Sequence, residues 1–136
     1  MKRTGIKKTS KTETAKLKAK CDKLLTPIIK ELHPYCEGCG SLTQVGHHWI
    51  EKSRSNNLRH EIDNIIPLCN SCHTKIHNRF GNSVMGSIDI ADKVRENRGE
   101  DWFNRMKVDG RKVVKVNKAW YQENFDRLKG ILDSLE

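Results

Sequence analysis

Apolar residues in the first part of the chain recur at helical spacing. Residues 12–32 carry them three or four positions apart, which predicts an amphipathic helix. Pro27 is expected to kink this helix or to restart it, with Thr26 as the cap of the second part. Cys21 lies on the apolar stripe, so we expect it in the core rather than at a metal. The apolar positions are Leu17, Cys21, Leu24, Leu25, Ile28 and Leu32.

The middle of the chain consists of short apolar stretches separated by polar residues. Residues 42–50 and about 60–66 are predicted to form the two arms of a β-hairpin, joined by the polar sequence EKSRSNN. Gly46 makes a bend in the first arm inexpensive. A helix is expected from Asn70 to about Phe80.

The last third of the chain has the pattern of helices. Ser87 is a candidate cap for a helix with apolar residues up to Val94, whereas residues 110–116 show no clear pattern. Asn117 is predicted to cap a terminal helix whose apolar side runs from Trp120 to Leu135. Such a side is typical of core packing or of a dimer surface. Together these elements predict an α+β fold.

The composition limits the size of the core. Only 35% of the 136 residues are hydrophobic and the mean hydropathy is −0.75. A small core normally needs a staple, such as disulfide bonds or a bound metal. No apolar run approaches the roughly 20 residues of a membrane span, and the amino terminus does not resemble a signal peptide. We therefore expect no membrane partner and a cytoplasmic location.

Positive charge is concentrated at the amino end. The formal net charge is +9, and residues 1–35 carry ten Lys and Arg against three Asp and Glu. This basic arm includes Lys7, Lys8 and Lys11, and it suits a polyanion because each Lys that meets a phosphate releases condensed counterions. Nucleic acid is the expected partner. The alternative is a solvated tail that only aids solubility.

Cysteine placement indicates a zinc site. Two Cys-x-x-Cys pairs are separated by 29 residues, and a fifth cysteine stands alone. An odd number of cysteines argues against a disulfide framework, whereas four thiolates can close a tetrahedral structural zinc site. The alternatives are two redox dithiols or chance spacing. The expected zinc ligands are Cys36, Cys39, Cys69 and Cys72.

All six histidines lie within residues 33–77. His73 and His77 are four residues apart in a predicted helix, so both rings lie on one face and can share a metal. His47 and His48 are neighbours on a predicted strand, where successive side chains point to opposite faces. One of that pair can therefore join a metal site while the other approaches a substrate, provided that the strand bends.

The order of these pieces resembles the ββα-metal, or HNH, nuclease motif. The matching parts are a hairpin that begins with His-His, the Asn64 of DNIIPLC, and the helix of CNSCHTKIH, within about residues 36–80. The interleaved cysteines are similar to those of the zinc-stapled branch found in many phage and bacterial nucleases. The upstream sequence KLKAKCDKLLTPIIKELHPYCEGCG is similar to the lead-in helix of phage NinG/Rap recombination nucleases.

The resemblance implies an architecture and a set of roles. A small ββα-metal core stapled by a four-cysteine zinc site would occupy residues 36–80, between a basic arm with a helix (1–35) and a C-terminal helical region (81–136). His48 matches the general base that activates water. His47 matches a metal ligand.

Further roles follow from the same resemblance. His73 and His77 match the remaining ligands of the catalytic divalent ion, although some relatives use only the first of these two. Asn64 matches the family's middle Asn, which ties down the loop and orients the base; an Asx turn is the alternative explanation. Arg54 and Arg59 are candidates for contact with the scissile phosphate.

Imidazole chemistry suits the hydrolysis of a phosphodiester. A neutral imidazole titrates near about 6.5 and is a suitable base, while one divalent cation can neutralise charge on the phosphate and the leaving oxygen. Three imidazole ligands favour Ni²⁺, Zn²⁺ or Mn²⁺ over Mg²⁺, but availability in the cell can outweigh this preference. All four ions remain candidates.

The sequence thus predicts a metal-dependent HNH DNA endonuclease, phage-encoded and acting in recombination or on branched DNA within the host cytoplasm. Non-specific nicking is the alternative activity, and a homodimer is an alternative to a monomer. A non-catalytic zinc-dependent DNA-binding module would explain the cysteines and the basic arm but would leave four histidines unexplained. An HNH partner of a phage packaging complex is the third hypothesis.

Overall fold

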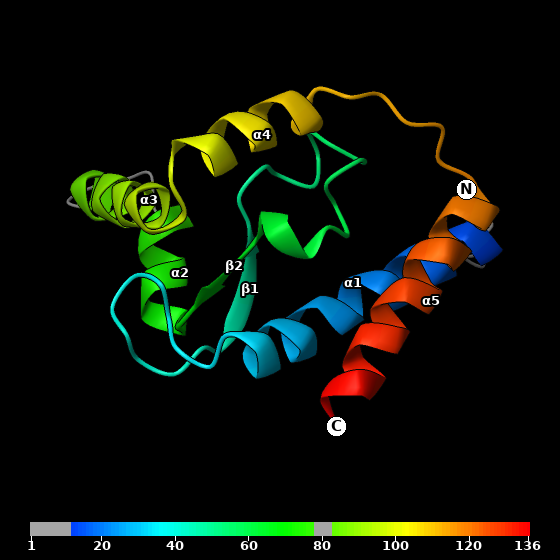
Figure 1. Ribbon diagram of the computed structural model, residues 1–136, viewed down its shortest axis with the longest axis horizontal. Coiled ribbons are helices and arrows are strands. Elements are labelled where there is room, and N and C mark those ends of the chain that lie inside the picture. The colour runs from blue at the N-terminus through cyan, green and yellow to red at the C-terminus, as the bar shows by residue number, and fades with distance from the viewer. Residues whose placement is uncertain (1–11, 78–82) are drawn as a thin grey trace, which may run out of the picture.

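Helices flank a small antiparallel sheet in the computed structural model, which describes residues 12–77 and 83–136 (Figure 1). Within these residues the sheet has two strands, and Val45 pairs with Leu68 while His48 pairs with Ile65. The α+β class predicted from the sequence is confirmed. The elements are α1 (Glu13–Leu32), β1 (Val45–His48), the 3-10 turn η1 (Ile62–Asn64), β2 (Ile65–Leu68), α2 (Asn70–His77), α3 (Ser83–Arg98), α4 (Glu100–Gly110) and α5 (Lys118–Leu135).

The first helix runs through Pro27 without restarting, so of the two expectations at this position, a kink or a new helix capped by Thr26, the new helix is wrong. A proline inside a helix costs about 3 kcal/mol. Ile28 and Ile29 are fully buried, and each such side chain contributes about 1.5–3 kcal/mol, so their burial offsets the proline. The cap of α1 is Thr12, and the hydroxyl of Thr26 instead accepts a hydrogen bond from the Gly46 N–H at 3.3 Å.

The strands are shorter than expected, and the second lies further along the chain. The predicted arms at 42–50 and 60–66 correspond to strands at 45–48 and 65–68. All four residues of β2 are buried, so this strand is covered on both faces and does not alternate between apolar and polar side chains. The second strand begins later than predicted because the residues just before it form the loop and η1.

The sheet separates two hydrophobic clusters among the described residues. Ile65 belongs to the cluster of α1 and α5, whereas Ile66 and Leu68 belong to the cluster of α3 and α4. Successive side chains of a strand point to opposite faces, which explains this division. In Figure 1, α1 and α5 accordingly lie at one end of the molecule, and α2, α3 and α4 at the other.

The C-terminal helices differ in part from the expectations. Asn117 caps α5 as predicted, with its Oδ1 accepting from the Trp120 N–H at 2.9 Å. Ser87 is not a cap, because α3 begins at Ser83; the Ser87 hydroxyl donates to the Ile76 carbonyl. No separate helix was predicted at α4, although it lies within the C-terminal region expected to be helical. The predicted end of α2 at Phe80 lies outside the described residues.

The apolar side of α5 packs against α1 of the same chain. Tyr121 and Leu128 are 4% and 0% exposed, and Cys21 on α1 donates to the Tyr121 carbonyl at 3.4 Å. This confirms the core position of Cys21 and covers the side on which a homodimer was considered. None of the helices in the described part of the chain has the length and apolar character needed to cross a membrane.

Candidate metal and nucleic-acid site

The four predicted zinc ligands converge beside the sheet. The Sγ atoms of Cys36, Cys39, Cys69 and Cys72 all lie within 4.8 Å of one another, and none forms a disulfide. One pair lies in the turn that follows α1, and the other leads into α2. A cluster of four free thiols at this spacing suits a closed tetrahedral zinc site.

The backbone around these cysteines also fits bound thiolates. The Gly38 N–H points to the Cys36 Sγ at 3.3 Å, and the Cys72 N–H points to the Cys69 Sγ at 3.4 Å. Each pair therefore directs a backbone donor at its first sulfur, which stabilises negative charge there. Gly38 is required by space, because a Cβ at this position would lie 2.8 Å from the Cys72 Sγ.

Three histidines form a second cluster. His47 on β1 and His73 and His77 on α2 each place a ring nitrogen within 4.8 Å of the others. The Nε2 atoms of His73 and His77 are 3.0 Å apart, as their spacing of four residues on one helix predicts. His73 directly follows Cys72, so the cysteine cluster fixes the beginning of the helix that carries both histidines.

The electrostatics of this cluster favour neutral imidazoles at His47 and His73. Burial, together with the neighbouring rings of His77 and His73, lowers the pKa of His47 to about 3. Burial also lowers the pKa of His73, and His77 adds to the effect. Neutral rings present lone pairs, so the three side chains have the chemistry of ligands for a divalent cation.

His48 lies in the same hollow as the three clustered histidines, but it faces a different partner. The hollow has a volume of about 730 Å³, and His47, His48, His73 and His77 line it. The His48 Nε2 is 2.8 Å from the Arg59 carbonyl oxygen. A carbonyl only accepts, so Nε2 carries the proton and Nδ1 keeps its lone pair. Burial lowers the pKa of His48, while this hydrogen bond raises it in part.

Gly46 lets the histidine strand approach its neighbours. A Cβ at this position would lie 2.7 Å from the Cγ2 of Ile65, which is fully buried. Any larger residue would push β1 away from β2 and from α1. The two histidines that follow Gly46 thus depend on its lack of a side chain for their positions.

Asn64 connects the two ends of the loop that follows β1. Its Oδ1 accepts from the Ile50 N–H at 2.8 Å, and its Nδ2 donates to the carbonyls of Ile50 at 3.1 Å and Leu58 at 3.3 Å. The side chain is fully buried. These bonds reach 14 and 6 residues along the chain, so they are not those of a local Asx turn.

The family comparison matches this part of the chain. The family model described as HNH endonuclease covers residues 36–79. This region, about a third of the chain, is similar to HNH endonuclease domains. No curated protein and no solved structure matches the chain, so the likeness to NinG/Rap nucleases has no support from relatives. An HNH domain indicates a nuclease or a DNA-binding function, with bound metal.

The two arginines predicted to contact phosphate lie in different surroundings. Arg59 lies in the loop that follows β1. Its side chain is 15% exposed, and its guanidinium is paired with Asp22 on α1, with an Nη2–Oδ2 distance of 2.7 Å. Hydrogen bonds to Asp22 raise the pKa of Arg59, so its charge is balanced within the protein. Arg54 is 77% exposed, with its Nε 3.5 Å from Glu51.

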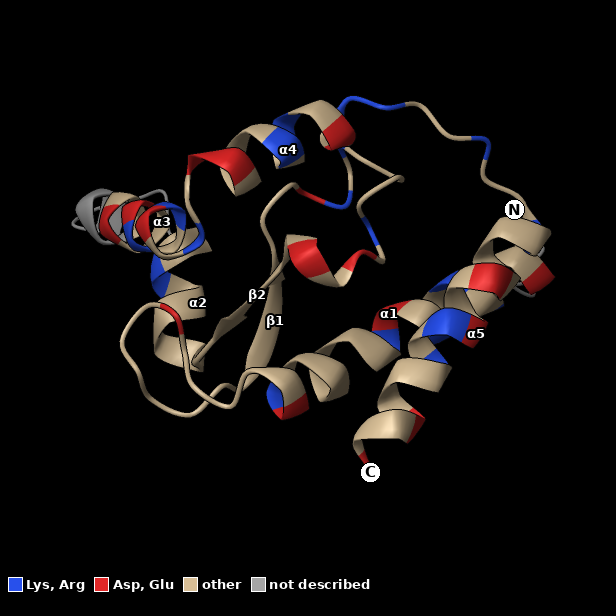
Figure 2. Ribbon diagram, in the orientation of Figure 1, with Lys and Arg blue, Asp and Glu red and all other residues tan. Residues whose placement is uncertain are grey.

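A basic hollow lies on the other side of the same loop. Its volume is about 600 Å³, and Arg54, Lys107, Arg111 and Lys112 contribute to its lining. Figure 2 shows positive residues along the connection from α4 to α5, beside the HNH domain. Of the residues predicted to contact DNA, Lys7, Lys8 and Lys11 lie outside the described residues, and the structure therefore places only the arginines.

Sequence reasoning missed the partners of the loop. Asp22 is a single acidic residue in KAKCDK, and its contacts with Arg59 and His60 join positions 37 and 38 residues apart. The basic segment RKVVKV follows an unexpected helix and carries no periodic pattern. Asp22 lies at the border of the apolar stripe of residues 12–32. A charged side chain at such a position normally has a partner, and this was the one indication of its role in the sequence.

Proposed function

We propose that this chain is a divalent-metal-dependent DNA endonuclease in which His48 is the general base. The observation that carries the proposal is the position of His48, beside a cluster of three imidazoles and in the same hollow. Its Nε2 is engaged by the Arg59 carbonyl. The HNH match supports the same reaction class.

The three clustered histidines fit a divalent cation. Their ring nitrogens lie within 4.8 Å of one another, and burial lowers the pKa of His47 and of His73, which keeps these two rings neutral near pH 7. A cation bound by His47, His73 and His77 would neutralise charge on the scissile phosphate and on the leaving 3′ oxygen. The proposed ions are Mg²⁺, Mn²⁺, Ni²⁺ or Zn²⁺, and the cluster of four cysteines would hold a separate structural zinc.

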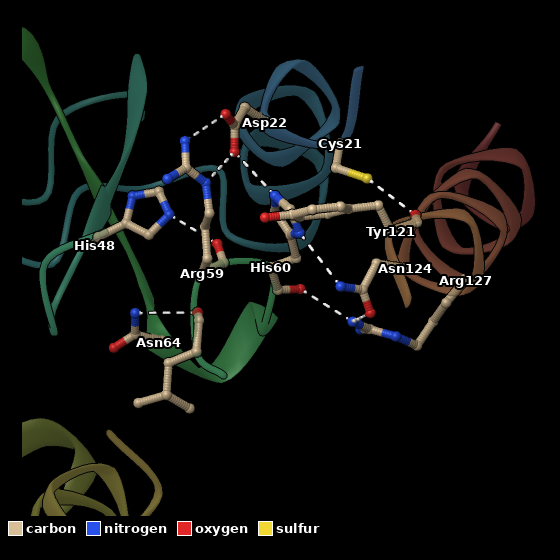
Figure 3. A network of polar contacts seen from close by, with 10 residues as sticks. Cys21, Asp22, His48, Arg59, His60, Asn64, Tyr121, Asn124 and Arg127 are labelled. Carbon is tan, nitrogen blue, oxygen red and sulfur yellow. Dashed lines mark hydrogen bonds and ion pairs between the residues drawn. The ribbon is translucent and has the colours of Figure 1, made fainter. Parts of the chain in front are cut away.

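His48 has the tautomer that a base requires. Its Nδ1 is the ring nitrogen that is not engaged by the Arg59 carbonyl (Figure 3), and it can take a proton from water as the water oxygen bonds to phosphorus and the bond to the 3′ oxygen breaks. The ring gains positive charge in this step. The Nε2–H bond to the Arg59 carbonyl then becomes charge-assisted and stabilises the imidazolium.

The loop after β1 gives the DNA a path across the surface. One part of it, from Glu51 to Ser53, lines the histidine hollow, while Arg54 and its neighbours line the basic hollow. A strand with its scissile phosphate at His48 would therefore continue over the loop towards the cations of the second hollow. Such contacts position the DNA backbone and do not recognise the base sequence. We therefore propose that the preferred substrate is defined by its structure, and that it is branched DNA.

The experiment is a nuclease assay on supercoiled plasmid, linear duplex and a four-way junction, with each of the four ions or with EDTA. We expect metal-dependent cleavage by the wild type and a loss of at least about 100-fold in His48→Ala, with DNA binding retained. His33→Ala is the matched control, because His33 is exposed at the end of α1 and outside the hollow.

Other outcomes assign other functions. DNA binding without cleavage in any metal would favour a non-catalytic zinc-dependent DNA-binding module. Cleavage that needs added partner subunits would favour a component of a phage packaging complex. Equal cleavage of the three DNA forms would replace branched-DNA preference with non-specific nicking.

A further inference from the structure

The carbonyl that engages His48 belongs to a segment with weak backbone support. Residues 59–61 lie before η1 and outside both strands. The Arg59 N–H reaches the Asn56 carbonyl at 3.3 Å, and the Glu61 N–H reaches the Leu58 carbonyl at 3.2 Å. Both are contacts within the loop itself. The longer-range contacts of the segment are made with side chains of α1 and α5.

Asp22 on α1 holds the segment from one side. Its Oδ1 accepts from the Arg59 Nε at 3.0 Å and from the His60 Nε2 at 2.9 Å, and its Oδ2 accepts from the Arg59 Nη2 at 2.7 Å. One carboxylate thus fixes two consecutive side chains. His60 is 1% exposed and Arg59 15% exposed, so water competes little with these bonds.

The helix α5 holds the same segment from the other side (Figure 3). The Asn124 Nδ2 lies 3.4 Å from the His60 Nδ1, so both nitrogens of that ring have a partner. The Arg127 Nη2 donates to the His60 carbonyl at 3.2 Å and to the Glu61 carboxylate at 3.3 Å. The rings of Trp120 and Tyr121 lie against His60, with centroids 6.2 Å and 5.9 Å away.

We propose that Asp22 is a positioning residue for His48, acting through the Arg59 carbonyl, and that α1 and α5 clamp the segment 59–61. Both helices lie outside the HNH match at residues 36–79. The catalytic part of this inference rests on the proposed function of His48 as the base. Its structural part, the fixing of the His48 ring with a proton on Nε2, does not.

The test compares Asp22→Asn with the wild type by two measurements. The ¹⁵N chemical shifts of the His48 ring report its tautomer in the zinc-loaded protein. We expect the Nε2–H form in the wild type and a mixture in the variant, because the amide replaces an oxygen that accepts from Arg59 or His60. We also expect kcat for DNA cleavage to fall about tenfold or more, with KM nearly unchanged.

Three variants make the result specific. Ile28→Val is the matched control on α1: it weakens the core by one methyl group without touching the network, so its His48 tautomer and kcat should be those of the wild type. Asp22→Glu restores the carboxylate and should recover part of kcat. If Asp22→Asn does not fold, Arg127→Gln removes the bond to the His60 carbonyl from a side chain that is 38% exposed, and it should shift the tautomer in the same direction.

Each outcome decides one of the two proposals. An unchanged His48 tautomer in Asp22→Asn and Arg127→Gln would overturn the positioning role. So would a kcat that falls equally in Ile28→Val. The remaining outcome is a shifted His48 tautomer in the variants together with a wild-type protein that cleaves no DNA. This outcome would support the clamp and overturn the nuclease function.

Discussion

Asn64 is a single side chain on which the geometry of the histidine strand depends. Its three hydrogen bonds join the residue just beyond β1, Ile50, to Leu58 near the end of the loop. The same loop carries the Arg59 carbonyl that engages His48. A buried amide with two donors and one acceptor in use cannot be replaced by an apolar group without leaving backbone groups unpaired.

Asn64→Ala should therefore lower the free energy of unfolding by about 2–4 kcal/mol. Urea denaturation followed by circular dichroism measures this loss, and cleavage should fall with it because the loop no longer holds the Arg59 carbonyl. Asn57→Ala is the matched control: Asn57 lies in the same loop, is half-buried, and has one bond, to the Asp109 carbonyl at 2.9 Å. Its loss should be about 1 kcal/mol, and equal losses in both variants would contradict the assigned role of Asn64.

At the scale of elements, the cysteine cluster joins parts of the chain that lack a large core of their own. The turn after α1 is exposed around Cys39, and the start of α2 has only Cys72 buried. A zinc ion held by the four cysteines would add to the few apolar contacts of these elements. It would thereby set the position of α2, on which His73 and His77 lie.

Cys36→Ser should abolish stoichiometric zinc and lower the melting temperature by roughly 10 °C or more. Zinc content by elemental analysis and a thermal melt measure the two effects. Cys21→Ser is the matched control, because Cys21 is equally buried but lies in the α1–α5 core, where a hydroxyl can still donate to the Tyr121 carbonyl. It should keep its zinc. A zinc-free Cys36→Ser protein that melts like the wild type would exclude the structural role.

The elements that the sequence predicted well are those with a local signal. The spacing of His73 and His77 and of each Cys-x-x-Cys pair places ligand atoms together within one turn or helix, and Asn117 caps α5 through a contact three residues away. Contacts distant in sequence decided the rest. Burial of Ile28 carries α1 past Pro27, and the partners of Asp22 come from a loop that no pattern links to α1.

At the scale of the whole molecule, the charges that join α1 to the loop make stability depend on pH. Burial alone would raise the pKa of Asp22, but hydrogen bonds from His60 and Arg59 outweigh it and hold that pKa well below its ordinary value of 3.8. The unfolded chain therefore binds this proton more readily than the folded protein. The stabilisation is complete above about pH 5 and is lost as the pH falls through the folded-state pKa.

The free energy of unfolding of the wild type should accordingly exceed that of Asp22→Asn by about 1–2 kcal/mol at pH 6, and the difference should shrink steadily below pH 4. Denaturation by urea across this range measures both proteins. Acid also protonates the metal ligands, but both proteins share them, so the difference isolates Asp22. Asp126→Asn changes an exposed aspartate of α5. The difference in free energy of unfolding between the wild type and this variant should not change with pH over the same range.

The packing of strand β2 determines how much of this chain must be transferred together to keep the site intact. Ile65 packs among α1 and α5, while Ile66 packs among α3 and α4, so one short strand needs apolar cover from both ends of the chain. The segment 36–79 that matches the family lacks all four of these helices, although it contributes Leu58 and Cys72 to the cluster around Ile66. A chimaera that received only that segment would carry the clustered histidines without the helices that hold β2 in place. Its host protein would have to supply an apolar surface for each face of the strand.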